Sequence, residues 1–304
     1  MKKFTLEERV PVPAPYRLDL TVDALRRLAA NVVDVVDEAG IYRRALADDR
    51  GVNLIEVTQP AGHYINVRIA GAQGRRWLPR IERMLGVRTN IDEWYARVRP
   101  FPWLAFLTDR LRGLRPPQYP SLWEAMAHAI VFQQISIHAA ASIMRRLIEG
   151  LGEPVDLGEK RYYPFLQPQV LLAAPEPALR AAGLSANKIM HLRNAAQAVA
   201  GGTLDAESID ALPSVQAAQR LCGIRGIGPW SAAVVLLRGF GRLDVFPMKD
   251  SGVARSIKLL SAQPAVDAYA LLEALGPVRG MLYFHLLLGR IRNLTATPPD
   301  SELT

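Results

Sequence analysis

The chain has 304 residues, of which 50% are hydrophobic and 22% are charged. These values are ordinary for globular proteins, so they exclude a disordered chain, and the length is enough for two or three compact domains. Lys and Arg outnumber Asp and Glu by 37 to 29, and the formal net charge of +8 favours a polyanionic partner such as nucleic acid or an acidic membrane.

Two further features of the composition exclude whole classes of protein. No apolar run approaches the roughly 20 residues of a membrane span, and the basic start at Met1 leads into charged residues, so we expect a cytoplasmic protein without a signal peptide. The single cysteine, Cys222, excludes an intrachain disulfide, a cysteine zinc site and an iron–sulfur cluster. We therefore expect no cofactor for catalysis.

Residues 1–115 mix strand and helix patterns. Val and Ile alternate in residues 52–57 and 64–69, which predicts strands, whereas residues 23–36 and 77–85 have helical spacing. We expect an α+β N-terminal domain here. The proline-rich segment Arg115–Pro120 disfavours helix and strand alike and marks the boundary.

From residue 116 to residue 295 the pattern indicates an all-α region. One apolar stripe runs from Leu122 to Ile148 and predicts a long helix that Ser121 caps. Further helices are predicted at 170–174, 177–182, 186–200 and 215–221. Residues 296–304 form a short tail.

The most informative segment is Leu221–Ala233, where a predicted helix is followed by a glycine-rich turn and a second helix that starts at Pro229. Gly226 and Gly228 have no Cβ, so their backbone can approach a ligand closely, and the amides at the next helix start favour an anion. This turn is suited to phosphate. The alternative is a plain corner between two helices with glycine caps.

A second candidate residue follows this hairpin. The predicted helix of residues 229–238 ends at Gly239, and an extended connector leads to Asp250 at the start of a helix over 251–260. Asp250 either accepts an amide hydrogen bond as a helix cap or serves as a functional carboxylate. Its position behind a phosphate-binding hairpin favours the second role.

The segment Leu221–Asp250, with its Gly-Ile-Gly-Pro-Trp core and its Asp-Val-Phe-Pro-Met-Lys-Asp connector, resembles the helix-hairpin-helix DNA glycosylase superfamily. Similar segments lie at 130–136 and 275–283, so the resemblance covers about residues 120–288. The N-terminal domain looks like that of the 3-methyladenine DNA glycosylase II branch. The resemblance implies a mainly α fold in which residues 116–295 form two helical subdomains with a cleft between them, preceded by an α+β domain.

The family's chemistry implies a monofunctional DNA glycosylase of base excision repair that acts on alkylated purines. Such an enzyme flips the damaged nucleotide out of the duplex, and Asp250 matches the carboxylate that stabilises positive charge on the sugar. Relatives that also cut the strand have a nucleophilic lysine where this chain has Trp230, so we expect no lyase activity. Two alternatives remain: excision of oxidised, deaminated or mismatched bases, and a non-catalytic DNA-binding protein.

Three residues match the family's base pocket. The indole of Trp230 would attract a cationic alkylated base, although helix packing alone would also explain it. Val234 and Val278 stand where alkylation-repair relatives often have aromatic residues. The preference between 3-methyladenine and a wider set of bases therefore stays open.

The resemblance also assigns contacts to duplex DNA. The residues concerned lie in the helix near 133, in the hairpin and beside Asp250: Gln133, Gln134, Arg225, Gly226, Ile227, Gly228 and Lys249. Gln134 takes the place of an apolar wedge in some relatives, and the alternative for both glutamines is pairing with each other or with backbone inside the core.

One inorganic ligand is implied by the family. Backbone carbonyls that hold a monovalent cation at the hairpin correspond to Cys222, Ile224 and Ile227. We further expect a monomer that is associated with the nucleoid in the cytoplasm.

Overall fold

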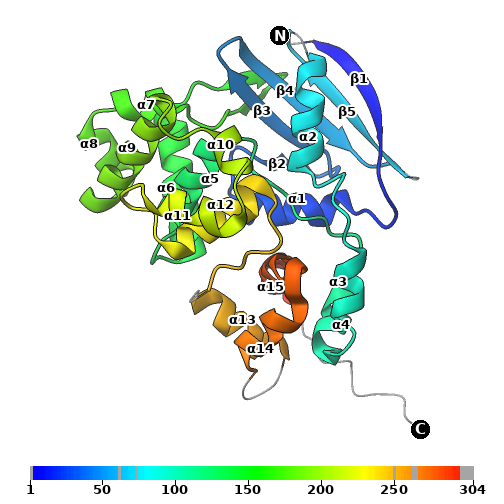
Figure 1. The fold of residues 1–304 in the computed structure, drawn as a ribbon. Helices are drawn as coiled ribbons and strands as arrows, with labels where there is room; N and C mark the ends of the chain where they lie inside the picture. Colours follow the sequence, from blue (N-terminus) through cyan, green and yellow to red (C-terminus); the bar gives the residue numbers. More distant parts are fainter. Residues whose placement is uncertain (1–2, 61–62, 73, 249–250, 262–265, 295–304) are drawn as a thin grey trace.

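The computed structural model describes residues 3–60, 63–72, 74–248, 251–261 and 266–294. An antiparallel sheet in the order β1-β5-β4-β3-β2 forms the N-terminal part (Figure 1). Its strands are β1 (Phe4–Pro11), β2 (Val35–Val36), β3 (Tyr42–Asp48), β4 (Gly51–Thr58) and β5 (Tyr64–Ala70). Helix α1 (Leu18–Arg26), the 3-10 turn η1 (Gly74–Trp77) and helix α2 (Leu78–Met84) accompany this sheet. The predicted α+β character is confirmed.

The two predicted strands are confirmed as β4 and β5, and the alternation is a true sheet pattern in β5, whereas β4 is buried on both faces from Asn53 to Val57. In β5, Ile65, Val67 and Ile69 are buried between partly exposed neighbours. The helix predicted for residues 23–36 is wrong beyond Arg26. There the Asn31 side chain accepts hydrogen bonds from the amides of residues 33 and 34, and this local turn competes with helix.

Helices dominate the region that follows residue 116, as predicted. They are α5 (Leu122–Val131), α6 (Ile137–Leu151), α7 (Pro168–Ala173), α8 (Glu176–Ala181), α9 (Ala186–Ala200), α10 (Ala206–Asp210), α11 (Ser214–Cys222) and α12 (Pro229–Phe240). One small hairpin, β6 (Val155–Leu157) with β7 (Lys160–Tyr162), corrects the prediction of an all-α region. Gly158 supplies the positive φ of +61° that this tight turn requires.

The long helix predicted from Leu122 to Ile148 is in fact two helices. Ser121 caps the first as expected, since its Oγ accepts from the Glu124 amide at 3.1 Å. The break comes at Gln134, whose φ is +57°, and Ser136 caps the second helix through a hydrogen bond from the Ala139 amide. Both helices are apolar on one side, so the stripe continued across the break and hid it.

Helices from two distant stretches of the sequence form a third part. Helices α3 (Asp92–Arg97) and α4 (Pro102–Arg110) share a buried core with α13 (Ser251–Ser261), α14 (Ala268–Leu275), η2 (Gly276–Val278) and α15 (Gly280–Ile291). This core includes Trp94, Leu104 and Phe284. Residues 92–110, which the sequence assigns to the N-terminal domain, therefore pack against the C-terminal helices; the boundary at residue 115 stays a prediction.

A buried histidine joins α3 to α15 in this third part. Trp94 donates from Nε1 to His285 Nε2 at 3.2 Å, and His285 Nδ1 lies 2.9 Å from the Met281 carbonyl. These partners fit the neutral ring with its proton on Nδ1. Burial lowers the pKa of His285 to about 4, so the ring is neutral at physiological pH.

Buried charges fix the sheet and α1 to the helices. Arg44 of β3 lies between Asp34, at 2.6 Å, and Glu124 of α5, whose Oε1 is also 2.6 Å away. All three side chains are buried, and burial raises the pKa of Glu124 to about 7. Arg238 of α12 donates to the carbonyls of Ala24 and Leu25 at the end of α1.

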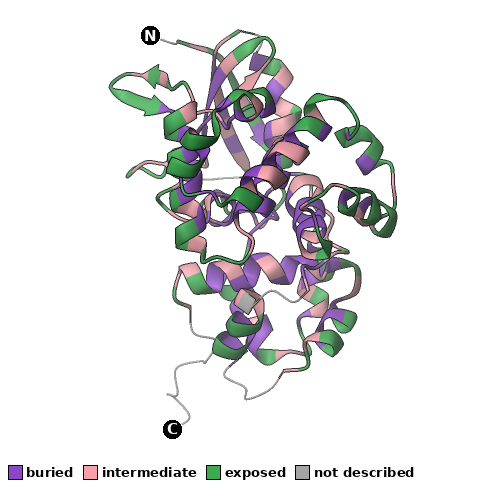
Figure 2. Cartoon of the chain, turned by 90° about the vertical axis from the view of Figure 1, so that its left-hand side faces the viewer, coloured by how far each residue is buried: buried purple, intermediate pink, exposed green. Residues whose placement is uncertain are grey.

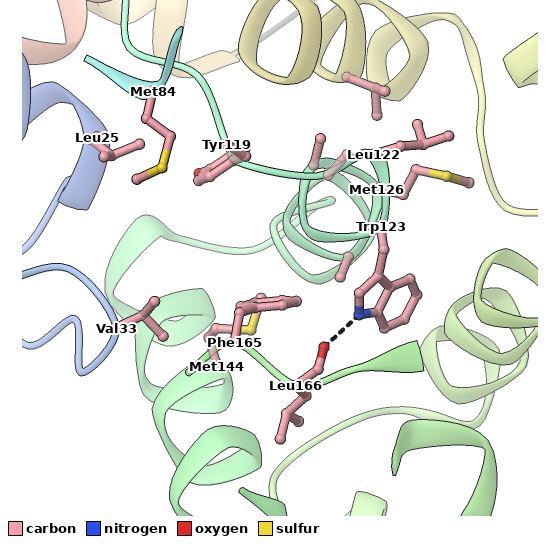
Figure 3. Packing of buried hydrophobic residues seen from close by; sticks show 14 of the residues in the cluster. Leu25, Val33, Met84, Tyr119, Leu122, Trp123, Met126, Met144, Phe165 and Leu166 are labelled. Atoms are coloured by element: carbon pink, nitrogen blue, oxygen red, sulfur yellow. Dashed lines mark hydrogen bonds between the residues drawn. The ribbon is translucent and has the colours of Figure 1, made fainter. Parts of the chain in front are cut away.

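The largest core surrounds α5. Figure 3 shows Trp123 projecting from this helix toward Leu166, with Tyr119 and Phe165 nearby, and the Trp123 indole donates to the Leu166 carbonyl at 2.7 Å. Buried residues line the inner faces of the helices, and exposed residues cover their outer faces (Figure 2). Within the described ranges, no single helix has both the length and the apolarity to cross a membrane; only the bent pair 268–278 and 280–291 passes when taken together.

Candidate functional site

The hairpin between α11 and α12 is a tight turn that is anchored in the core by one buried residue. Ile227 is buried and belongs to the core around α5, and its amide donates to the Ile224 carbonyl at 2.9 Å. Gly228 is the N-cap of α12, and Pro229 begins the helix. Arg225 is exposed at the tip. The predicted helix, turn and helix are confirmed.

The two glycines of the turn are required for different reasons. Gly226 has a φ of +103°, and a Cβ added there would lie 2.5 Å from the His191 Cβ, so only glycine fits against α9. A Cβ added at Gly228 would meet nothing within 4 Å. The face at Gly228 is therefore open to a ligand from outside.

The turn also contains two backbone donors that are unpaired among the described residues. Within the described ranges, the amides of Gly226 and Gly228 donate to no protein acceptor. They lie at the positive end of the α12 dipole, and the exposed residue Arg225 directly precedes Gly226 in the chain. Free amides, a helix N-terminus and a nearby cation together suit a phosphate group.

Gln133 is tied to this hairpin. Its Nε2 donates to the Gly226 carbonyl at 2.9 Å and to Ser231 Oγ at 2.7 Å, so both amide hydrogens have protein acceptors. This is the pairing with backbone that the sequence left as an alternative for Gln133. A DNA contact by the same residue stays a prediction.

The loop between α5 and α6 consists of residues 132–136 and therefore includes Gln133, and its residues 134–136 are exposed. Gln134 is exposed in the left-handed conformation, and the large apolar side chain of Ile135 is 38% exposed beside it. Sequence reasoning missed Ile135, although its place off the apolar stripe between Ile130 and Ile137 was a usable signal. The loop thus offers one polar and one apolar side chain to a partner.

The three residues predicted for a base pocket come from two cores. Trp230 is partly buried in the first turn of α12, and Val234 lies one turn later on the same helix face, fully buried. Val278 is buried in η2 and belongs to the core of the third part. Val245, in the connector after α12, packs against both cores and so joins the two sides.

Asp250 and Lys249 lie outside the described residues. The connector that leads to them is held on its N-terminal side: the Gly280 amide donates to the Leu243 carbonyl at 2.7 Å, and Phe246 is buried. Helix α13 follows at Ser251. The roles of Asp250 and Lys249 stay predictions.

The carbonyls of Cys222, Ile224 and Ile227 lie in or beside the hairpin turn, and a cation held by them stays a prediction. Cys222 is exposed, and the Ile224 carbonyl has one lone pair left after it accepts the hydrogen bond from Ile227. Among the residues that the structure describes, no group of three or more His, Cys, Asp and Glu side chains could hold a metal ion.

Comparison with known proteins agrees with this geometry. Residues 127–276 match the HhH-GPD superfamily of base excision DNA repair proteins. The chain is 35% identical over 239 residues to DNA-3-methyladenine glycosylase 2 of Escherichia coli, which covers 76% of this chain and 80% of that protein. The chain belongs to the HhH-GPD superfamily.

Two other proteins are similar to this member of the superfamily. The DNA-3-methyladenine glycosylase of Bacillus subtilis is 27% identical over 180 residues, which span 59% of either chain and thus less than two thirds of that relative. The 3-methyladenine DNA glycosylase structure from Archaeoglobus fulgidus has a TM-score of 0.79 at 24% identity and covers 95% of this chain and 99% of that chain. The predicted family and fold class are confirmed, and the protein acts in base excision DNA repair.

Proposed function

We propose that this HhH-GPD protein is a monofunctional DNA glycosylase that hydrolyses the N-glycosidic bond of alkylated purines, of the 3-methyladenine type, in duplex DNA. The observation that carries the proposal is the hairpin turn, which has amides at Gly226 and Gly228 that pair with no described acceptor, open space at Gly228 and the exposed residue Arg225. The 35% identity to a 3-methyladenine glycosylase supports the substrate class.

DNA binding follows from the hairpin. Its two amides and Arg225 would grip one phosphate of the strand, and Lys249 would add charge close to Asp250. The damaged nucleotide would leave the stack, and the α5–α6 loop with Gln134, which is exposed, would enter the gap. The net charge of +8 supports binding to this polyanion.

Selection of the damaged base rests on Trp230, Val234 and Val278. The partly exposed indole of Trp230 attracts a base that carries positive charge more strongly than its neutral parent. Val234 and Val278 supply apolar walls without further aromatic faces. This composition favours a damaged purine over a normal one through a single aromatic contact.

Asp250 supplies the chemistry. As the bond to the base breaks, the sugar acquires oxocarbenium character, and a fixed carboxylate stabilises that charge while water attacks the anomeric carbon. The base leaves with the electron pair of the glycosidic bond, and the product is an abasic site. Because Trp230 has no nucleophilic amine, the strand stays intact.

The decisive experiment compares wild-type protein with Asp250→Asn on methylated, oxidised and deaminated duplex DNA, with released bases measured by mass spectrometry. We expect wild type to release alkylated purines, and Asp250→Asn to release them at least about 100-fold more slowly, as for loss of one electrostatic catalytic group. Binding to abasic duplex should persist in Asp250→Asn because the hairpin is unchanged.

Each alternative gives a different result in this assay. Release of oxidised or deaminated bases alone would reassign the substrate, and binding without any release would indicate a DNA-binding protein. Unchanged release by Asp250→Asn would contradict the mechanism. Strand cleavage that borohydride traps as a protein–DNA adduct would contradict the monofunctional assignment.

We propose three further properties that rest on the same site. The carbonyls of Cys222, Ile224 and Ile227 would hold a monovalent cation that bridges the hairpin to phosphate. The protein would act on DNA as a monomer. Its place would be the cytoplasm, in association with the nucleoid.

A further inference from the structure

Helix α9 contacts both loops that the proposed function directs at DNA. Lys188, in its first turn, donates from Nζ to the Val131 carbonyl at 2.5 Å and to the Gln133 carbonyl at 3.0 Å. These carbonyls lie at the C-terminal end of α5, where helical acceptors have no intrahelical donor and where positive charge is favourable. Lys188 thus fixes the start of the α5–α6 loop.

His191 makes the second contact of α9. It lies three residues after Lys188, so both side chains share one face of the helix. His191 packs directly against Gly226, as the distance of 2.5 Å from an added Cβ to the His191 Cβ shows. The hairpin and the α5 end therefore rest on neighbouring positions of one rigid helix.

Gln133 completes a ring of contacts. Its backbone carbonyl accepts from Lys188, while its side-chain Nε2 donates to the Gly226 carbonyl. The path runs from Lys188 to Gln133, from Gln133 to Gly226, and from Gly226 through His191 back to α9. Movement of either loop would break at least one of these contacts.

Lys188 takes this position at an electrostatic cost. The side chain is half-buried, burial lowers its pKa, and the hydrogen-bond partners of its ammonium are the carbonyls of Val131 and Gln133. Removing an ammonium from water costs free energy, and hydrogen bonds to two neutral carbonyls offset this cost less than an ion pair would. Its placement is explained by the geometry that it imposes on the α5 end.

We propose that Lys188 is a positioning residue that holds the α5–α6 loop, residues 132–136, and the hairpin, residues 223–228, in one fixed arrangement. The distance between the loop that would enter the duplex and the hairpin that would bind phosphate then stays constant while a nucleotide is flipped. The effect on flipping rests on the proposed function. The mechanical coupling of the two loops does not.

The coupling is tested by hydrogen exchange on the full-length protein with Lys188→Met, which keeps the side-chain length and removes the donors. The matched control is Lys160→Met, at an exposed lysine in the β6–β7 hairpin. We expect exchange of the hydrogen-bonded amides in the two segments, those of residues 132, 133, 224 and 227, to rise at least about 10-fold in Lys188→Met and to stay unchanged in Lys160→Met. A rise in only one of the two segments, or in neither, overturns the proposal.

The positioning role is tested by single-turnover base release at saturating methylated duplex. Misplacement of the loop should lower the rate constant about 10- to 100-fold. The dissociation constant for abasic duplex should change less than about threefold, since the hairpin amides remain. A rate constant within about twofold of wild type in a folded Lys188→Met protein overturns the role, because misplacement costs more than that.

Two controls keep these results separable. If Lys188→Met does not fold, Lys188→Arg replaces it: a guanidinium still donates to both carbonyls, so exchange and rate should stay within about threefold of wild type, and a larger change overturns the proposal. If wild-type protein and Lys160→Met release no base from any damaged duplex, the proposed function fails. The exchange result then decides the coupling of the loops by itself.

Discussion

The open face of the hairpin predicts that two glycines separated by one residue respond oppositely to the same change. In Gly228→Ala the new methyl group meets no protein atom within 4 Å, and the φ of −94° and ψ of −179° suit alanine. The free energy of unfolding should therefore change little or rise by about 0.4–1 kcal/mol, because alanine restricts the unfolded chain. DNA binding should suffer because the methyl group occupies the path of the phosphate.

The size of this effect follows from the contact that is lost. A hydrogen bond to a charged group is worth about 1.5–3 kcal/mol. Its loss in Gly228→Ala corresponds to roughly a 10- to 150-fold higher dissociation constant for abasic duplex. Fluorescence anisotropy at one fixed salt concentration measures this constant, and urea unfolding measures the stability of the same preparation.

Gly226→Ala is the matched comparison. Its Cβ would overlap His191, and the φ of +103° is unfavourable for alanine, so we expect a loss of at least about 1–3 kcal/mol in stability. The reasoning is refuted if Gly228→Ala binds DNA as wild type does. It is also refuted if Gly228→Ala is as unstable as Gly226→Ala.

Two further predictions concern the buried polar groups. Because the folded pKa of His285 lies near 4 and the unfolded pKa near 6.5, the folded state binds fewer protons between these values; its contribution of up to about 3 kcal/mol is complete above pH 6.5 and is lost as the pH falls towards 4. Urea unfolding at pH 7 and pH 4.5 should show this loss in wild type and a smaller one in His285→Gln. An equal change in the free energy of unfolding between the two pH values in both proteins would contradict the prediction. Arg44→Met leaves Asp34 and Glu124 buried without their cation and should lower the free energy of unfolding by about 3–5 kcal/mol, and a change below about 1 kcal/mol would show that the two carboxyl groups are protonated or hydrated instead.

Hydrophobic periodicity and residue composition in the sequence predicted those helices and strands whose conformation depends mainly on neighbouring residues in the chain. Helix α9 has the bounds that its spacing predicted, and β4 and β5 contain their predicted strands. Burial alternates along β5, whereas β4 is buried without a break from Asn53 to Val57 and is predicted by its apolar, β-branched composition. The single helix predicted for residues 122–148 failed at Gln134. Its left-handed backbone depends on tertiary contacts around the loop, and periodicity carries no information about them.

The candidate site shows the same division. The glycine turn and Pro229 were readable from sequence because each has a conformational reason of its own. Lys188 and His191 were not readable, since they meet Gln133 and Gly226 across 55 and 35 residues of chain. Asp250 was reached through the family resemblance, because an aspartate before a helix is by itself an ordinary cap.

The core of the third part has a consequence for how this protein can be divided. Trp94 and Leu104 come from residues before the predicted boundary at 115, yet they fill the space between α13, α14 and α15. A shortened protein that begins at residue 116 would keep the glycosylase hairpin and lose about half of the apolar lining that holds the last three helices in place. Those helices follow directly on the connector to Asp250. We therefore expect that residues 116–304 do not fold as an independent unit, because residues 91–114 complete the core of the last three helices.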